Sequence, residues 1–253
     1  NQNRIADARV TINNAIRADD DVSDYYIILG RIEYAAEGFE NAFAAYSEAL
    51  ALDGTNEEAL QAISQIGLRI GLYDESKDAT NKLLVLNPNQ KNALLTNGQH
   101  ALIGRNYAQA LNYADNILSL DGLDEGGVVL KARATFLAGN TVDAVHILDD
   151  YEAARPNTAA VSLTRLEIYR KLRDADRMAK QFVELERLLP NDFTLRLDEA
   201  NFRFKTANAV RANIILARML ASKQATQKNM SDAIGLWQEY AVSSLDVALV
   251  RSI

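Results

Sequence analysis

A constant 34-residue period constrains the fold of this chain more than any other property of its sequence. Small side chains return at that interval, at Ala8, Ala42, Ser76, Ala110, Ala144 and Ala212, with Met178 as the exception. Residues typical of turns return at the same interval, at Asp20, Gly54, Pro88, Gly122, Pro156 and Pro190. A period of 20–50 residues indicates an array of repeats, each of which buries its apolar face against its neighbours.

Residues 24–56 are the clearest copy of the repeat. Apolar residues recur there at helical spacing before and after a predicted turn at Glu37-Gly38, and Gly54 ends the second run. The pattern predicts two short amphipathic helices in each repeat. It divides the chain into a second helix left from a truncated repeat (1–22), six repeats (23–56, 57–90, 91–124, 125–158, 159–192 and 193–226, the last two divergent) and a capping helix or partial seventh repeat (227–253).

Composition excludes several classes of function. The net charge of −7 argues against nucleic acid as the principal partner, because phosphate binding needs a basic surface. The absence of cysteine excludes disulfides, thiolate metal sites and cysteine nucleophiles. No apolar run approaches the roughly 18 residues that predict a membrane span. The missing cysteines and the start at Asn1 favour a bacterial periplasm or cell envelope over the cytoplasm, without fixing the compartment or showing whether the termini are natural.

The pattern within residues 23–56 resembles the tetratricopeptide repeat (TPR) family. The matching residues are Tyr26, Leu29-Gly30, Tyr34, Phe39, Ala42, Tyr46 and Ala49, with Gly54 in place of the family's proline. Further matches follow in the next two repeats, at Tyr73, Leu84, Leu86, Pro88, Gly98, Tyr107, Ala110 and Leu120. The resemblance covers nearly the whole chain, strongly to about residue 158 and weakly afterwards. Related helical repeats such as HEAT and armadillo have longer periods.

The resemblance implies an all-α fold, a right-handed solenoid of antiparallel helix pairs whose first helices line a concave groove. It also implies a non-catalytic scaffold that binds a peptide, a helix or a whole protein. The alternative is a regulatory or partner-recruiting segment of a larger enzyme or of a secretion or envelope assembly. Because fold alone does not fix function, the groove has to be argued from its residues.

Groove residues are expected on the first helix of each repeat, facing away from the second helix. Three positions recur there at the 34-residue interval: a mainly polar one that begins at Arg31, an apolar one that begins at Ile27 and a largely aromatic or apolar one that begins at Tyr34. Such a surface would suit an extended or helical peptide. The alternative is that the polar side chains are simply solvated and the apolar ones pack between repeats. The candidate partner-binding residues are Ile27, Arg31, Tyr34, Gln65, Arg69, Leu95, Gln99, Leu102, Val129, Arg133, Phe136, Glu167, Arg170, Lys171, Asn201 and Phe204.

Two other groups of residues give weaker evidence for a binding site. The Lys and Asn clamp with which some TPR proteins hold a C-terminal carboxylate is absent, since Ile27, Arg31, Ala62, Asn92 and Thr96 occupy its positions. Residues 205–228 contain no Asp or Glu, so a weak anionic contact is expected through Lys205, Arg211 and Arg218, against the alternative of a solvated face.

No active site, metal site or cofactor is expected. His100 and His146 lie far apart in the sequence and have no ligand pattern around them, and no phosphate loop or nucleophile motif occurs. Self-association is a further expectation, because the exposed ends of helical arrays can stack on one another.

Overall fold

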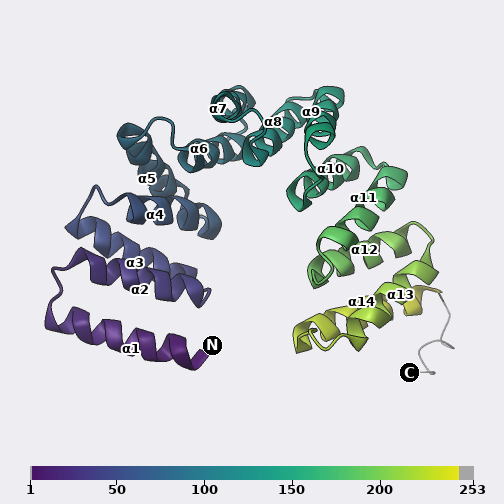
Figure 1. The fold of residues 1–253 in the computed structure, drawn as a ribbon. Coiled ribbons are helices and arrows are strands. Elements are labelled where there is room, and N and C mark those ends of the chain that lie inside the picture. Colours follow the sequence, from purple (N-terminus) through teal and green to yellow (C-terminus); the bar gives the residue numbers. More distant parts are fainter. Residues whose placement is uncertain (1, 245–253) are drawn as a thin grey trace. The chain divides into compact units, whose positions relative to one another are not determined.

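In the computed structural model, the backbone is described for residues 2–244 and the side chains for residues 4–240. This part of the chain contains fourteen α-helices and no strand (Figure 1), which confirms the all-α prediction. The helices are α1 (Gln2–Ala18), α2 (Ser23–Ala35), α3 (Phe39–Leu52), α4 (Glu57–Ile70), α5 (Tyr73–Leu86), α6 (Lys91–Ile103), α7 (Tyr107–Leu120), α8 (Glu125–Leu137), α9 (Thr141–Ala154), α10 (Ala159–Leu172), α11 (Ala175–Leu188), α12 (Phe193–Lys205), α13 (Ala209–Ala221) and α14 (Gln227–Ser244).

The helices alternate with the period of the sequence. We call α2, α4, α6, α8, α10 and α12 the first helices, and the helix after each of them a second helix. Each first helix begins exactly one sequence period after the previous one, and α14 begins one period after α12. Within each pair the two helices pack against each other, and most second helices also pack against the next first helix. Where a second helix packs against the next first helix, the two pairs bury apolar surface against each other, as a helical repeat requires.

Two compact units make up the chain, one up to Pro156 and one from Asn157 onward. In the N-terminal unit (α1–α9), α6 packs against both α4 and α8, whereas second helices of consecutive pairs touch at most marginally. The first helices of this unit therefore lie closer together than the second helices do. Its core includes two clusters of Leu, Ile, Ala and Tyr side chains, one around Leu60 and one around Ile117.

The C-terminal unit (α10–α14) repeats the arrangement on a smaller scale. Its helix α14 packs against α13 and against the first helix α12. Ala200, Ile215, Leu216 and Ala233 belong to a buried hydrophobic cluster of this unit, and Trp237 packs against that cluster. Trp237 also donates a hydrogen bond from Nε1 to Asn213 Oδ1 (2.6 Å), so α14 is attached by polar as well as apolar contacts.

Short polar side chains fix where many of the helices begin. Each accepts a hydrogen bond from the backbone N–H three residues further on, which satisfies a donor that the first turn leaves unpaired. This explains why helices start reproducibly after a turn although the sequence between repeats varies. The capping residues are Asn56, Asn106, Asp124, Thr158, Asp174, Asp192 and Asn208.

The turn between the first and second helix of each repeat places one residue in the left-handed region of the backbone. The φ angles there lie between +57° and +100°, and the positions recur with the period of the sequence. Only two of the six are glycines, although side chains other than glycine pay a steric cost in this conformation. The six residues are Glu37, Gly71, Arg105, Gly139, Arg173 and Ala207.

We expect Ala207→Gly to stabilise the protein, because Ala207 has a φ of +57°. Relief of the steric cost, about 1–2 kcal/mol, is partly offset by the greater freedom of glycine in the unfolded chain, so the gain should be about 0.5–1 kcal/mol. The matched control is Ala217→Gly, at an exposed position inside α13, which should lose about 1 kcal/mol. Chemical unfolding of both variants measures the difference. A change in the free energy of unfolding with the same sign in both variants would contradict this account of the turn.

Candidate functional site

The predicted partner-binding residues of the N-terminal unit differ widely in exposure. Side chains on α2 and α4 reach solvent, whereas those on α6 and α8 are half-buried. Ile27 was predicted to face a partner, but it is only 5% exposed and packs in the core cluster around Leu60. It therefore offers no surface to a partner. The exposed residues are Arg31, Tyr34, Gln65 and Arg69, and the half-buried ones are Leu95, Gln99, Leu102, Val129, Arg133 and Phe136.

Arg31 is paired with a residue of the neighbouring first helix. Its Nε donates a hydrogen bond to Glu58 Oε1 at 2.6 Å, and its Nη2 donates to the other carboxylate oxygen. The hydrogen bond from Arg31 holds the pKa of the Glu58 carboxyl below its usual value. Because both side chains are well exposed, water and salt screen the pair, and a partner's carboxylate could replace Glu58 at little cost.

A cation–aromatic cluster lies where the turn after α2 meets the end of α4. The guanidinium carbon of Arg69 lies 3.9 Å from the centroid of the Phe39 ring, and Tyr34 packs edge-on against the same ring at 5.5 Å. The contact links two consecutive repeats. Because Tyr34 and Arg69 remain exposed, the cluster presents an aromatic edge and a positive charge to solvent.

In the C-terminal unit, residues of α14 cover part of the predicted face. The Tyr240 hydroxyl donates to Asn201 Oδ1 at 3.0 Å, and its ring stacks on Phe204 with a centroid distance of 4.4 Å. Arg170 forms an ion pair with Asp198 of the next first helix. Glu167 is half-buried and Lys171 is exposed. A partner would therefore meet a surface that the chain itself partly covers at Asn201 and Phe204.

His100 takes part in a buried hydroxyl network that the sequence did not predict. Ser76 donates its single hydroxyl proton to the backbone oxygen of Ser64, and Thr80 donates to the backbone oxygen of Ser76 at 2.6 Å. His100 Nε2 must therefore carry a hydrogen and donate to Ser76 Oγ, which lies 2.8 Å away. Burial, and then the positive charge of Lys77, lower the pKa of His100. The network thus joins α4, α5 and α6 through hydrogen bonds among Ser64, Ser76 and His100.

An arginine cluster around Glu186 was also missed, because it joins residues far apart in the sequence. Arg196 Nη1 lies 2.7 Å from Glu186 Oε1, Arg211 donates to the second oxygen, and Arg218 lies 3.5 Å away. Burial alone would raise the pKa of Glu186, but the hydrogen bonds from Arg196 and Arg211 lower it overall. The basic strip expected at residues 205–228 is thus partly compensated by this carboxylate. The anionic contact through Lys205, Arg211 and Arg218 stays a prediction.

Two kinds of feature are absent from the described residues. No three His, Cys, Asp or Glu side chains among them lie close enough together to hold a metal ion. None of the helices described here combines the length and apolar character needed to cross a membrane.

No family model matches the chain. A curated relative, anaphase-promoting complex subunit 3 of Schizosaccharomyces pombe, is 22% identical over 171 residues. The match covers 68% of this chain but spans only 26% of the length of that relative. A crystal structure of a tetratricopeptide repeat protein from Parabacteroides merdae superposes with a TM-score of 0.74, covers 93% of each chain and is 17% identical. This chain has the TPR fold.

A second TPR structure bears on binding. YrrB, described as a TPR protein with an unusual peptide-binding site, superposes with a TM-score of 0.50 at 17% identity. The alignment covers 73% of this chain and 95% of YrrB. At such identities the likeness to both solved structures establishes a TPR fold, and it leaves the partner to be argued from the residues themselves.

Proposed function

We propose that this TPR chain is a non-catalytic scaffold that binds a peptide, a helix or a protein through the surface of its first helices. The observation that carries the proposal is the combination of side chains on that surface in the N-terminal unit. Exposed Arg31, Tyr34 and Arg69 stand on two consecutive first helices. Tyr and Arg are among the residues that contribute most to protein interfaces, so this surface is chemically suited to a partner.

Half-buried apolar residues extend the same surface along the next two first helices. Leu95 and Leu102 lie on α6, and Val129 and Phe136 lie on α8. Gln99 and Arg133 provide polar groups between them. Apolar side chains would supply affinity, and the amide and guanidinium groups would pair with the backbone or the carboxylates of the partner. In the C-terminal unit we propose Glu167, Arg170 and Lys171 for the same role, with Asn201 and Phe204 available only where Tyr240 leaves them uncovered.

The repeat boundaries set the register of these residues. We propose six repeats over residues 23–226, flanked by a second helix of a further repeat at 1–22 and by a capping or partial repeat at 227–253. Residues 1 and 245–253 of these flanking segments lie outside the described part of the chain. Support comes from the constant interval between helix starts and from the left-handed residue that recurs at the same interval. A right-handed superhelix and a concave groove belong to the same proposal.

Site-specific photo-crosslinking in the native cell tests which surface binds. We expect a benzoylphenylalanine residue in place of Gln65, on the exposed surface of α4, to give a discrete covalent adduct whose partner mass spectrometry identifies. The matched control replaces Lys82, which is also exposed but lies on the second helix α5. An adduct at position 82 with none at position 65 would place the partner on the second helices and overturn the proposal.

The alternative function, a partner-recruiting segment of a larger protein, is favoured by one observation. The curated relative is a subunit of a complex, and the region matched to this chain spans about a quarter of its length. We propose this reading as the second candidate. The sequence of the full gene product decides it, since a catalytic domain on the same polypeptide would support the segment and its absence would support a separate scaffold. An envelope location and self-association remain predictions, and light scattering tests the latter.

A further inference from the structure

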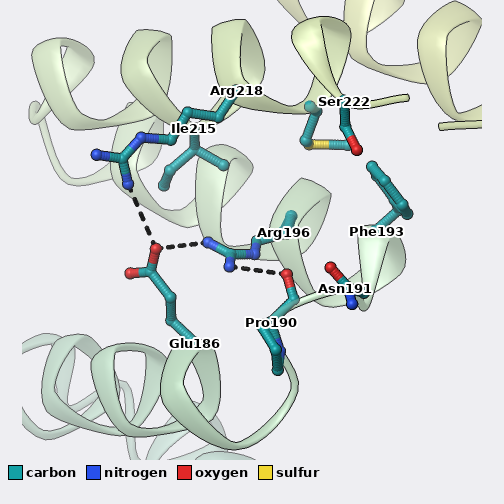
Figure 2. A pocket seen from close by; sticks show the side chains of 9 residues that line it. Glu186, Pro190, Asn191, Phe193, Arg196, Ile215, Arg218 and Ser222 are labelled. Atoms are coloured by element: carbon teal, nitrogen blue, oxygen red, sulfur yellow. Dashed lines mark hydrogen bonds and ion pairs between the residues drawn. The ribbon is translucent and has the colours of Figure 1, made fainter. Parts of the chain in front are cut away.

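A pocket of about 140 Å³ opens between α11, α12 and α13, all within the C-terminal unit. Charged and apolar side chains line different parts of it (Figure 2). Ile215 and Met219 from α13 are buried and supply apolar surface, together with half-buried Phe193 at the start of α12. Glu186, Arg196 and Arg218 supply the charged groups. The pocket therefore combines an apolar wall with converging guanidinium groups.

Positive charge exceeds negative charge around this pocket. Arg196, Arg211 and Arg218 surround Glu186, while Arg203 pairs with Glu199 at 3.0 Å and Arg211 lies 3.6 Å from the same carboxylate. Four guanidinium groups thus face two carboxylates. Asp192, which follows the lining residue Asn191, caps the first turn of α12. The sequence from Lys205 to Ser231 contains no acidic residue, so α13 adds no compensating charge.

Arg218 is the guanidinium group that remains open to a ligand. Arg196 and Arg211 already hydrogen-bond to the two oxygens of Glu186. The Nη1 of Arg218 lies 3.5 Å from Glu186, beyond normal hydrogen-bond length, and no hydrogen bond from Arg218 occurs within the described part of the chain. Its side chain is 64% exposed. An incoming oxyanion could therefore take two parallel hydrogen bonds from Arg218 without breaking the contacts that hold Glu186.

We infer that this pocket is a second binding site, which takes the carboxylate of an acidic side chain from a peptide segment of a partner protein. None of the residues that line this site belongs to the candidate partner-binding residues of the first-helix surface proposed above. The carboxylate would pair with Arg218 at the mouth of the pocket, and an apolar residue of the same peptide would contact Phe193, which lies on the opposite side of the pocket from the Arg218 guanidinium (Figure 2). The inference goes beyond the proposed function, since neither site requires the other.

Two observations favour a carboxylate on a peptide over a phosphate. Among the guanidinium groups described around this pocket, Arg218 alone offers a free pair of donors, which the two oxygens of a carboxylate satisfy, whereas a phosphate would leave further charged oxygens unpaired beside Glu186. Ile214 lies between Arg211 and Arg218 on α13 and is 41% exposed, so apolar surface continues beside the charged mouth. A peptide that alternates acidic and apolar residues matches both features at once.

Fluorescence anisotropy with two labelled peptides tests the inference on the full chain. One peptide alternates Leu and Glu, and the other alternates Leu and Gln. We expect saturable binding of the Leu/Glu peptide alone, and about tenfold weaker binding to Arg218→Ala, since charge-assisted bidentate pairs are among the stronger hydrogen-bonded contacts. Arg218→Gln keeps most of the side-chain stem and should show a similar loss. Far-UV circular dichroism checks that both variants remain helical.

Lys228→Ala is the matched control, because it removes one positive charge from an exposed residue of α14 that does not line the pocket. Binding by Lys228→Ala should stay within about twofold of the wild type, as screening weakens distant surface charges. An equal loss in Lys228→Ala and Arg218→Ala would mean general electrostatic attraction and would overturn the site. So would equal binding of the Leu/Gln peptide, or no binding at all. Phosphate that displaces the peptide better than acetate at equal ionic strength would overturn the carboxylate assignment.

Discussion

Replacing Phe182 with alanine is expected to destabilise the C-terminal unit by about 3–5 kcal/mol, the cost typical of a large aromatic side chain removed from a core. Phe182 is 1% exposed and is the largest of the fully buried side chains. Its ring packs against Phe202 of α12 with a centroid distance of 5.2 Å, so it joins α11 to the next first helix. Alanine would lose this contact and leave a cavity that two packed helices cannot close completely.

The loss should be local, because each helix pair in a repeat array is stabilised mainly by its neighbours. Hydrogen exchange followed by mass spectrometry should show faster exchange in peptides from α10–α13, with protection in α4–α7 retained. A single melting temperature is a poorer measure, since a chain of two compact units need not unfold in one step.

Val183→Ala is the matched control for this prediction. Val183 is the next residue of α11 and is 58% exposed, so its truncation should change the free energy of unfolding by no more than about 0.5 kcal/mol. A Phe182→Ala variant with wild-type exchange in α10–α13 would show that this ring does not hold the unit together. Equal loss of protection in α4–α7 would contradict the local character of the core.

The architecture was predictable because it is encoded locally and repeated. Turn residues, small residues and apolar spacing all recur with the same period, so every copy supports the same assignment of helices. The left-handed positions in the turns were harder to predict from the sequence. Glycine normally signals such a conformation, yet Glu37 adopts it beside Gly38, and Arg105 adopts it beside Gly104. The period identifies these positions, whereas the residue types do not.

Helix geometry allowed only part of the candidate surface to be predicted. A helical pattern shows which residues share one side of a helix, and it placed Arg31, Tyr34, Gln65 and Arg69 on an exposed side. It could not show that Ile27 would be buried in the core cluster, since burial depends on how closely two helices approach. It also could not show that Tyr240 would cover Phe204, which lies more than one repeat earlier in the sequence.

The arginine cluster illustrates the same limit for charge. Residues 205–228 contain no acidic residue, which predicted a weak anionic contact through Lys205, Arg211 and Arg218. The structure brings Glu186 from α11 against Arg211 and Arg218 of α13, so part of the compensation comes from the previous repeat. Charge patterns along one segment therefore describe a repeat protein incompletely, because each helix faces its neighbours as well as solvent. The same packing forms the pocket beside Arg218.

Ala110→Leu is expected to cost about 1–3 kcal/mol through overpacking. Ala110 lies on α7 with no exposed surface, in the cluster formed by Leu94, Ile117 and Leu130. Protein interiors are packed about as densely as organic crystals, so three additional carbon atoms would force α6 and α7 apart or push side chains out of their preferred rotamers. Urea unfolding monitored by circular dichroism measures the loss.

Ala108→Leu separates overpacking from the effect of leucine on the helix itself. Ala108 is exposed on the same helix, and leucine is nearly as good a helix former as alanine, so the free energy of unfolding should change by less than about 0.5 kcal/mol. The equivalent positions Ala42, Ser76, Ala144 and Ala212 are also fully buried, whereas Met178 fills the same position in the fifth repeat. In the fifth repeat the neighbouring side chains therefore leave room for a larger residue than they do at Ala110. Wild-type stability of Ala110→Leu would show that α6 and α7 do not approach closely at Ala110.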